Sequence, residues 1–361
     1  MFPDRYQILG PALDGGMGSV HLCYDQTLER KVAIKVIHNP KNERRIIDEV
    51  DALLKLRSKH VVQVYDIIRV GKGKGIVQEY VEGSDLWDTP DCTLSSGELC
   101  KQLWQIASGI EDIHKAGVIH RDIKPNNIKN DLEGVIKIFD FGLARDEGMS
   151  ASTMGFVGTF GFAAPELFDD NPKFTTAVDV YGFGATAFHL IAGSLPKYMQ
   201  KPTRPVELPS NSLDEFKCGL PDSALRVIES CLAVEVSARP SMTQVRETLA
   251  KDLLRNRHRA LLVHKGEASY LHSERKAVRA SWDGVGSITI RYDGLVFFAG
   301  EVEGDVYINY APAVKGQELP GSCVIALGAP TRGDVPPILS SASVWSPIPY
   351  PEEIGREETF Y

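Results

Sequence analysis

The sequence predicts an α+β body over residues 1–255 followed by a small all-β module over residues 256–361. In the first 90 residues, short β-rich apolar runs alternate with turns. From about residue 95 to residue 255, the apolar residues fall mainly at helical spacing. After about residue 256, strand-like runs are separated by Asp-Gly and Glu-Gly turns. These three residue patterns together predict the fold class.

In the first part of the body we expect strands at 32–36, 61–70 and 76–81, because these runs are short, apolar and β-branched. Residues 43–56 instead predict a helix, since their apolar side chains recur at helical spacing and their basic ones lie off that stripe.

In the second part of the body we expect helices at 95–114, 176–192, 222–233 and 241–255. The first is amphipathic. The second is mostly apolar and is therefore expected to be buried.

In the module we expect strands at 285–290, 295–298 and 306–310, and a hairpin at Asp293-Gly294. Residues 330–361 are rich in Pro, Ser and Glu and are expected to form a loop or a wrapped tail.

The composition is that of an ordinary globular protein, with 24% charged and 43% hydrophobic residues. A formal net charge of -8 gives no electrostatic reason to expect a nucleic-acid partner. The first residues, Met-Phe-Pro-Asp-Arg, lack the pattern of a signal peptide. The best apolar run, 180–192, is shorter than the roughly 20 residues that span a bilayer. We therefore expect no membrane span. Six cysteines without C-x-x-C spacing indicate reduced thiols, so we expect a cytoplasmic protein.

Glycines cluster at Gly15, Gly16 and Gly18, just before an apolar strand that ends in Lys35. Glycine lets the backbone approach a polyphosphate and direct its N–H groups toward it, although such clusters also form simple hairpin turns. The lysine is more informative, because a cation in an apolar strand needs a partner. A phosphate could serve, and so could Glu49 on the expected helix.

A polar segment, His120-Arg121-Asp122-Ile123-Lys124-Pro125-Asn126-Asn127, precedes Asp140-Phe141-Gly142. Phosphoryl transfer needs mainly positioning and charge neutralisation. Asn127 and Asp140 offer the hard oxygen ligands that Mg²⁺ prefers. Asp122 is suited to orient an attacking hydroxyl and Lys124 to stabilise the phosphoryl in transfer. Each aspartate alone reads as a turn or helix cap, but their order and spacing fit one mechanism.

These motifs resemble those of the eukaryotic-type (Hanks-type) Ser/Thr protein kinase family, bacterial members included, over residues 5–255. Ala164-Pro165-Glu166, the run from Asp179 to Gly184, and Arg239 match further family motifs. The resemblance implies a two-lobed fold, with ATP and Mg²⁺ between the lobes. It also implies an N-lobe at about 1–81, a hinge at about 79–85 and a C-lobe at about 86–255.

The resemblance implies a role for each matching residue. Lys35, Glu49, Asp122, Lys124, Asn127 and Asp140 would form the catalytic set. ATP contacts would come from Gly15, Gly16, Gly18, Val20, Ala33, Lys35, Gln78 (the gatekeeper), Glu79, Val81 and Lys129. Structural roles would fall to Glu166, Asp179 and Arg239. Lys124 is the family's Ser/Thr signature, which implies protein substrates with Ser or Thr hydroxyls.

Between Asp140 and Glu166 lie the candidate regulatory residues Ser150, Ser152, Thr153 and Thr159. In the family, an arginine placed like Arg121 often pairs with a phosphate on this loop. We therefore hypothesise activation by (auto)phosphorylation at Thr153 or Ser152; the alternative is that these are simply polar loop residues. Thr159 is expected to hold the substrate loop against the catalytic residues.

Two residues depart from the family pattern. Leu13 replaces the first loop glycine, and Lys129 stands where the family places an apolar side chain under adenine. The lysine stem could cover the base, or its cation could stack on it. Alternatively, Lys129 weakens adenine binding or marks an unusual nucleotide preference.

The module weakly resembles the last strands of forkhead-associated domains, which read phosphothreonine, around 304–309 and 319–328. The phosphate-reading Ser-Arg-x-x-His pattern of those domains is not recognisable here. We therefore expect a degenerate β-sandwich that docks on the kinase body or on a protein partner. For the whole chain, the main reading is an active kinase. The alternative is a pseudokinase scaffold that binds a partner through this module, and a small-molecule phosphotransferase is a weaker competitor.

Overall fold

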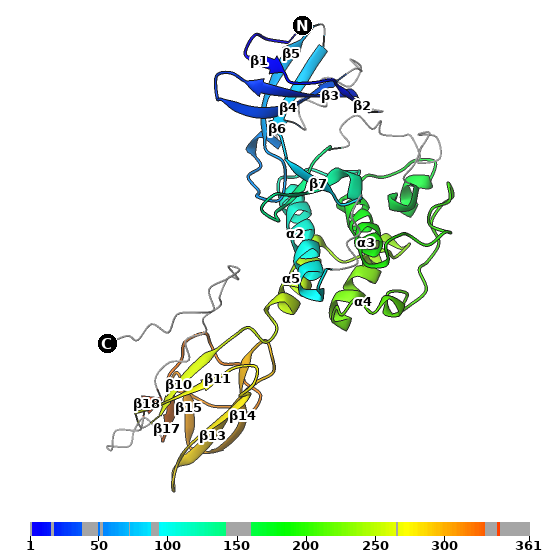
Figure 1. Cartoon of the computed structure of the whole chain (residues 1–361). Coiled ribbons are helices and arrows are strands. Elements are labelled where there is room, and N and C mark those ends of the chain that lie inside the picture. The colour runs from blue at the N-terminus through cyan, green and yellow to red at the C-terminus, as the bar shows by residue number, and fades with distance from the viewer. Residues whose placement is uncertain are drawn as a thin grey trace. The chain divides into compact units, whose positions relative to one another are not determined.

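The computed structural model describes residues 2–15, 18–37, 50, 53–71, 73–87, 94–141, 160–264, 266–328 and 338–339, and every structural statement below concerns these residues. The chain divides into two compact units, Met1–Leu253 and Leu254–Tyr361 (Figure 1). Each unit is described by itself.

The first unit opens with an antiparallel sheet in the strand order β1-β3-β4-β6-β5, with β2 paired to β3. Its strands are β1 (Tyr6–Ile8), β2 (Leu13–Gly15), β3 (Gly18–Asp25), β4 (Arg30–Ile37), β5 (Val64–Val70) and β6 (Gly73–Glu79). A small core of Tyr6, Cys23, Val32, Ile34 and Val77 packs on this sheet. The three strands expected here are present. Of the helix expected at 43–56, Val50 and residues 53–56 are described; Val50 and residues 53–55 are helical, and Leu56 is not.

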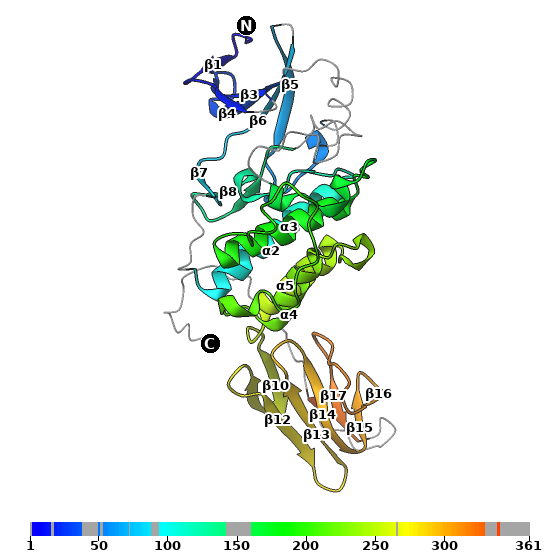
Figure 2. The ribbon, with the colours of Figure 1, turned by 90° about the vertical axis from the view of Figure 1, so that its right-hand side faces the viewer.

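The rest of the unit contains the helices labelled in Figure 2, together with a short sheet. The helices are α2 (Ser96–Lys115), α3 (Thr176–Ala192), α4 (Asp222–Cys231) and α5 (Met242–Leu254). All four expected helices are therefore confirmed. α2 begins with a capping box in which Ser95 and Glu98 bond each other's backbone. α3 is buried along nearly its whole length, as its apolar composition predicts, and ends at Gly193 with φ 75°.

A short antiparallel sheet combines one strand that precedes α2 with two strands that lie between α2 and α3 in the sequence. It consists of β7 (Gly83–Asp85), β8 (Ile128–Asp131) and β9 (Ile136–Ile138). Short 3-10 turns complete the unit: η2 (Pro125–Asn127), η3 (Phe160–Phe162), η4 (Pro165–Phe168), η5 (Asp214–Phe216) and η6 (Val236–Ala238). Because β8 starts directly after η2, this sheet fixes the end of the polar segment 120–127.

Between Arg255 and the end of its described residues, the regular elements of the second unit are all strands. These are β10 (Ala260–His264), β11 (Glu267–Leu271), β12 (Ala277–Trp282), β13 (Gly286–Tyr292), β14 (Phe297–Gly304), β15 (Val306–Ile308), β16 (Ala311–Pro312), β17 (Ile325–Leu327) and β18 (Ile338–Leu339). They form the sheets β10-β11, β12-β13-β14 and β16-β15-β17-β18. The inward residues of all three sheets share one apolar core. The α+β prediction for the chain, with its all-β module, is thus confirmed.

The expected hairpin at Asp293-Gly294 is present, with Tyr292 paired to Phe297 and Gly294 at φ 107°. Two strand limits were wrong. The strand expected at 295–298 begins at Phe297, because Asp293 Oδ1 accepts bonds from the N–H groups of Leu295 and Val296 and extends the turn. The strand expected at 306–310 ends at Ile308, since the next two residues take left-handed turn conformations.

Among the described helices, none combines the length and the apolar character needed to cross a bilayer.

Candidate active site

Asp179 of α3 holds the backbone of the polar segment 120–127. Its buried carboxylate accepts hydrogen bonds from the N–H of His120 at 2.8 Å and from the N–H of Arg121 at 2.7 Å. His114 Nε2 lies 2.9 Å from the same carboxylate. An apolar helix thus carries one buried acid that is fully used to position a loop. Arg121 needs this support, because its φ of 70° is unusual for a side-chain-bearing residue.

His120 connects this segment to the residues that follow β9. Its ring is fully buried, Nε2 lies 3.0 Å from the carbonyl oxygen of Phe139, and Nδ1 accepts from the N–H of Asp122 at 3.3 Å. Burial lowers the pKa of His120. The neutral imidazole fits both bonds, with Nε2–H as donor and Nδ1 as acceptor. The ring also packs on Phe141, with centroids 4.7 Å apart. His120 therefore couples the two polar segments without facing solvent.

Three predicted site residues meet at the carboxylate of Asp122. Lys124 Nζ lies 2.9 Å from Asp122 Oδ2, and Asn127 Nδ2 donates to the same oxygen at 3.0 Å. Asn127 Nδ2 also donates to the backbone oxygen of Asp122 at 2.8 Å. η2, with Pro125 in its first turn, turns the chain back so that these contacts form. The structure therefore brings Asp122, Lys124 and Asn127 together.

Asp140 follows the last residue of β9 by two positions and adopts φ 61°. Its carboxylate forms an ion pair with Lys35 Nζ of β4. Lys35 is mostly buried, whereas Asp140 is more than a third exposed. The sequence suggested Glu49 as the lysine's partner, and Glu49 lies outside the described residues. Lys35 is thus brought to the same carboxylate that the sequence predicted as a metal ligand.

The glycine cluster forms the end of a hairpin, with Gly15 of β2 opposite Gly18 of β3; Gly16 lies outside the described residues. Val20 of β3 pairs with Lys35, and Ala33 of β4 pairs with Gln78 of β6. The pairing of β3, β4 and β6 thus sets these four predicted contact residues on adjacent strands of one sheet.

Glu79 and Val81 follow at the end of β6. The Glu79 carboxylate pairs with Lys137 of β9 at 2.8 Å and accepts from the N–H of Gln63 at 3.0 Å. Val81 is buried in the main core of the unit. The sequence did not identify Lys137. The one sequence feature that could have pointed to Lys137 is its place between two isoleucines of a short strand.

A scan against known protein families matches residues 6–249 to the protein kinase domain. The chain belongs to the protein kinase family. Among similar curated proteins, the probable serine/threonine-protein kinase pknA2 of Bifidobacterium longum is 32% identical over 67% of this chain and 34% of its own length. The serine/threonine-protein kinase PrkC of Bacillus subtilis is 35% identical over 53% of this chain and 31% of its own length. The chain thus spans about a third of the length of these relatives. Kinase family membership implies ATP as substrate and typically Mg²⁺.

Within this kinase fold, Lys129 of β8 lies between an acid and a ring. Its Nζ is 3.9 Å from Asp85 Oδ1 and 5.7 Å from the ring centroid of Phe139. The pairing of Asp85 with Lys129 across β7 and β8 fixes this arrangement. Because Ile128 points into the core, the next residue must point to the opposite face of the strand.

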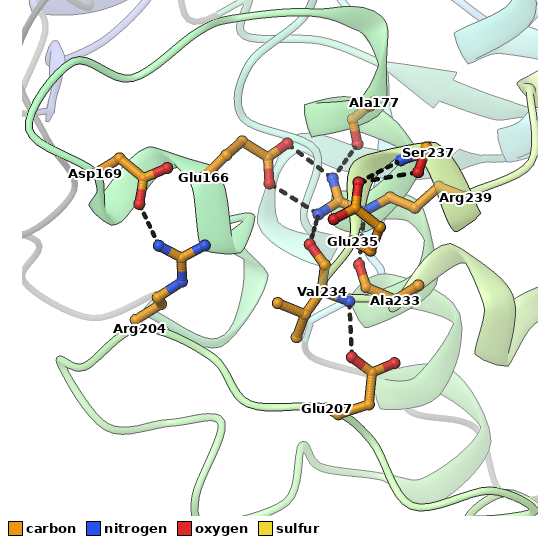
Figure 3. A network of polar contacts seen from close by, with 10 residues as sticks. All are labelled: Glu166, Asp169, Ala177, Arg204, Glu207, Ala233, Val234, Glu235, Ser237 and Arg239. Carbon is orange, nitrogen blue, oxygen red and sulfur yellow. Dashed lines mark hydrogen bonds and ion pairs between the residues drawn. The ribbon is translucent and has the colours of Figure 1, made fainter.

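Glu166 and Arg239 form a buried bidentate ion pair, with both N–O distances at 2.8 Å (Figure 3). The guanidinium also donates to the carbonyl oxygens of Ala177 at 2.9 Å and Ala233 at 2.8 Å. Arg239 therefore ties η4, the start of α3 and the turn before α5 to one another. The Arg204–Asp169 pair beside it in Figure 3 is about half exposed and has no such set of partners.

The candidate regulatory residues Ser150, Ser152, Thr153 and Thr159 lie outside the described residues. Arg121, the expected partner of a loop phosphate, is described: its guanidinium lies 5.3 Å from the ring centroid of Phe174. The phosphorylation hypothesis therefore stays a prediction.

Proposed function

We propose that this chain is an active Ser/Thr protein kinase that transfers the γ-phosphoryl group of Mg-ATP to protein hydroxyls. The observation that supports it most is the contact of Lys124 Nζ and Asn127 Nδ2 with one oxygen of Asp122. A carboxylate held by two donors, together with the Lys35–Asp140 ion pair, has the chemistry that phosphoryl transfer requires.

The residues present fit a divalent cation. Asn127 uses its amide nitrogen toward Asp122, which leaves its Oδ1 as a neutral oxygen donor. Asp140 offers carboxylate oxygens. Oxygen donors of this kind suit Mg²⁺. When bound, Mg²⁺ neutralises phosphate charge during transfer.

The protein groups have separate tasks in this proposal. Asp122 accepts a hydrogen bond from the substrate hydroxyl and orients it toward the γ-phosphate. Lys124, already beside Asp122, stabilises the negative charge of the phosphoryl group in transfer. Lys35 binds the ATP phosphates and exchanges its contact with Asp140 for them. The Gly15–Gly18 hairpin supplies backbone N–H groups to the same phosphates.

Three variants, compared with wild type, test the proposal by transfer of labelled γ-phosphoryl from Mg-ATP to a generic protein substrate. Asp122→Asn should bind Mg-ATP but lose transfer at least about a hundredfold. Asp140→Asn should lose the Mg²⁺ dependence of nucleotide binding. Asp170→Asn, at an exposed position in the same unit, is the control and should retain activity. A wild-type protein that binds Mg-ATP but transfers nothing would instead support the pseudokinase scaffold.

Lys129 is proposed to contact the adenine of ATP, with its aliphatic stem against the base and its ammonium directed to Asp85. If this partly buried cation weakens adenine binding, Lys129→Leu should lower the Kd for ATP by about tenfold. Calorimetric titration of ATP and GTP against both proteins measures this. An unchanged Kd for both nucleotides would show that the stem already serves as the apolar surface.

We further propose that the kinase domain spans 1–255, that Thr153 or Ser152 is phosphorylated on activation, and that residues 256–361 contact the kinase body or a protein partner. Among the described residues, Cys23, Cys100, Cys218 and Cys231 form no disulfide, which is consistent with a reducing, cytosolic setting. Mapping of phosphorylated residues in wild type and Asp122→Asn tests the regulatory part. Loops that stay unmodified in an active wild type would contradict it.

A further inference from the structure

Two ion pairs join the strand sheet of the kinase unit to the chain segment that contains β9. The first is the pair of Lys35 with Asp140, and Lys35 lies beside Ile76 of β6. The second links Glu79, the last residue of β6, to Lys137 of β9, with Nζ–O distances of 2.8 and 3.1 Å. Glu79 follows Ile76 by three residues, which is about 10 Å along a strand, and Lys137 precedes Asp140 by three residues. The two pairs therefore connect the same two segments at separate points.

The carboxylate of Glu79 is held from two sides. Besides its contact with Lys137, it accepts a hydrogen bond from the N–H of Gln63 at 3.0 Å, and the N–H of Glu79 donates to the carbonyl oxygen of Gln63 at 2.8 Å. The residue before Gln63 is itself bonded to β9, because the N–H of Val62 donates to the carbonyl oxygen of Ile138 at 2.9 Å. The end of β6 is thus fixed to a frame that includes β9.

The Glu79–Lys137 pair is largely removed from solvent. The Lys137 side chain is 15% exposed and the Glu79 side chain is 25% exposed. Such a pair contributes little net stability, because the loss of hydration offsets much of the attraction between the charges. Separating the two charges is costly, since each would remain partly buried without a partner. The pair therefore holds β6 and β9 at one distance more than it stabilises the fold.

Lys137 also lies beside Lys129, the residue proposed above to contact the base of ATP. The two lysines are direct cross-strand partners on β9 and β8. Like charges in such positions repel each other. The ammonium of Lys137 is drawn to Glu79, whereas that of Lys129 lies 3.9 Å from Asp85 Oδ1 on the other side. The contact with Glu79 thus keeps the second cation away from the proposed base contact.

We propose that Lys137 is a positioning residue for ATP, which sets the distance between the strand sheet and strands β8 and β9 through its ion pair with Glu79. The residues proposed to contact ATP are divided between these two parts, with Lys35 on the sheet and Lys129 on β8. When Lys35 exchanges Asp140 for the ATP phosphates, the Glu79–Lys137 pair remains as the link between the two parts. This inference rests on the proposed function and adds a residue that acts through Glu79.

The test measures the Kd for Mg-ATP by calorimetric titration, together with kcat and KM for phosphoryl transfer to a generic protein substrate. Lys137→Met should raise the Kd and the KM for ATP about tenfold, because the two parts of the site are no longer held at one distance. Its kcat at saturating ATP should stay within about twofold of wild type, since the groups around Asp122 are unchanged. Lys137→Arg keeps a cation that can bind a carboxylate through two hydrogen bonds, and its Kd should stay within about threefold of wild type.

A double variant separates positioning from stability. Lys137→Met alone leaves the Glu79 carboxylate partly buried without its cation and should lower the melting temperature. In Glu79→Met/Lys137→Met no unpaired charge remains, so the melting temperature should rise again relative to the single variant. The Kd for Mg-ATP should nevertheless stay about tenfold above that of wild type, because flexible Met side chains do not fix the distance. A purely structural role of Lys137 would instead let the affinity recover with the stability.

Lys31→Met is the matched control. Lys31 of β4 forms an ion pair with Glu82 at 3.7 Å, but both side chains are more than half exposed, so this pair contributes little. The control should leave Kd, KM and kcat unchanged. An unchanged Kd for Mg-ATP in Lys137→Met would overturn the inference, and so would recovery of the affinity in the double variant.

Failure of the proposed function has a different signature. A wild type that binds Mg-ATP but transfers no phosphoryl group would reject the kinase activity, while the comparison of Kd values would still decide the role of Lys137. A wild type that binds no Mg-ATP would reject both.

Discussion

The buried imidazole of His60 makes the free energy of unfolding of the kinase unit depend on pH. His60 is 3% exposed, contacts the edge of Trp104, and has Nδ1 3.2 Å from the carbonyl oxygen of Ile136. Burial lowers the pKa of His60 to about 4. The hydrogen bond to Ile136 and the charge of Asp112 act against this shift, whereas Lys59 and Lys137 add to it, all by smaller amounts. The folded state therefore excludes a proton that the unfolded chain binds below its own pKa of about 6.5.

The sign follows from this order of pKa values. The stabilisation is present above about pH 6.5 and is lost as the pH falls toward 4. His60 alone should thus lower the free energy of unfolding by about 2 kcal/mol between pH 7 and pH 5. Urea denaturation at both pH values measures it. In His60→Gln, which does not titrate, the difference between the two pH values should shrink by that amount; an unchanged difference would contradict the assignment.

Tyr310 is a residue whose replacement should stabilise the protein. It is 85% exposed and sits with Asn309 in the turn between β15 and β16, at φ 70°. A non-glycine residue pays a steric cost in this conformation, while the side chain makes little contact in return. Tyr310→Gly should raise the free energy of unfolding of the second unit by about 1 kcal/mol.

The control for this prediction is Tyr270→Gly. Tyr270 is half exposed and lies within strand β11. A glycine inside a strand weakens it. That variant should be destabilised by about 1 kcal/mol. Urea denaturation of both variants compares them, and destabilisation of Tyr310→Gly would show that the exposed ring makes a contact worth more than the strain.

At the level of elements, α3 supports the catalytic segment by direct backbone contact. A Cβ at Gly182 would stand 2.9 Å from the carbonyl oxygen of Ile123, which lies between Asp122 and Lys124. Gly182→Ala should therefore displace this segment by a few tenths of an ångström and lower kcat by tenfold or more. Steady-state phosphorylation kinetics measure the effect, and thermal unfolding shows whether the fold is retained.

Gly97→Ala is the matched helical control, because nothing lies within 4 Å of its added Cβ in α2. It should leave kcat unchanged and stabilise α2 by up to about 1 kcal/mol. Equal kinetics for Gly182→Ala and wild type would mean that the contact between α3 and the catalytic segment does not position Asp122.

Elements with a strong local pattern could be predicted from the sequence. The stripe of apolar residues located α2, the continuous apolar run located α3, and Asp293-Gly294 located the hairpin between β13 and β14. Motif chemistry likewise pointed to Asp122, Lys124 and Asn127, because they lie close together in sequence and converge through one turn.

Contacts between distant segments could not be predicted in this way. The pairing of Lys35 with Asp140, and the stacking of Trp87 on His189, depend on how strands and helices pack. A buried histidine such as His120 also gives no local signal, because its partners are backbone atoms of other segments. Such residues are recognised only once the fold brings their partners together.

On the scale of the whole molecule, the protein kinase match ends at residue 249, and the second compact unit begins at Leu254. That unit has its own core, made from the inward faces of its three sheets. We predicted that this module is a degenerate β-sandwich that docks on a protein partner or on the kinase body. That prediction therefore concerns a separate folding unit.

The central claim is that the polar cluster around Asp122 transfers phosphate to protein hydroxyls. Its most direct test is residue-level mass spectrometry of a protein substrate after incubation with Mg-ATP and either wild type or Asp122→Asn. We predict phosphoryl groups on Ser and Thr residues with wild type and none with the variant. Bound ATP without transferred phosphate in either sample, or equal phosphorylation in both, would contradict the claim.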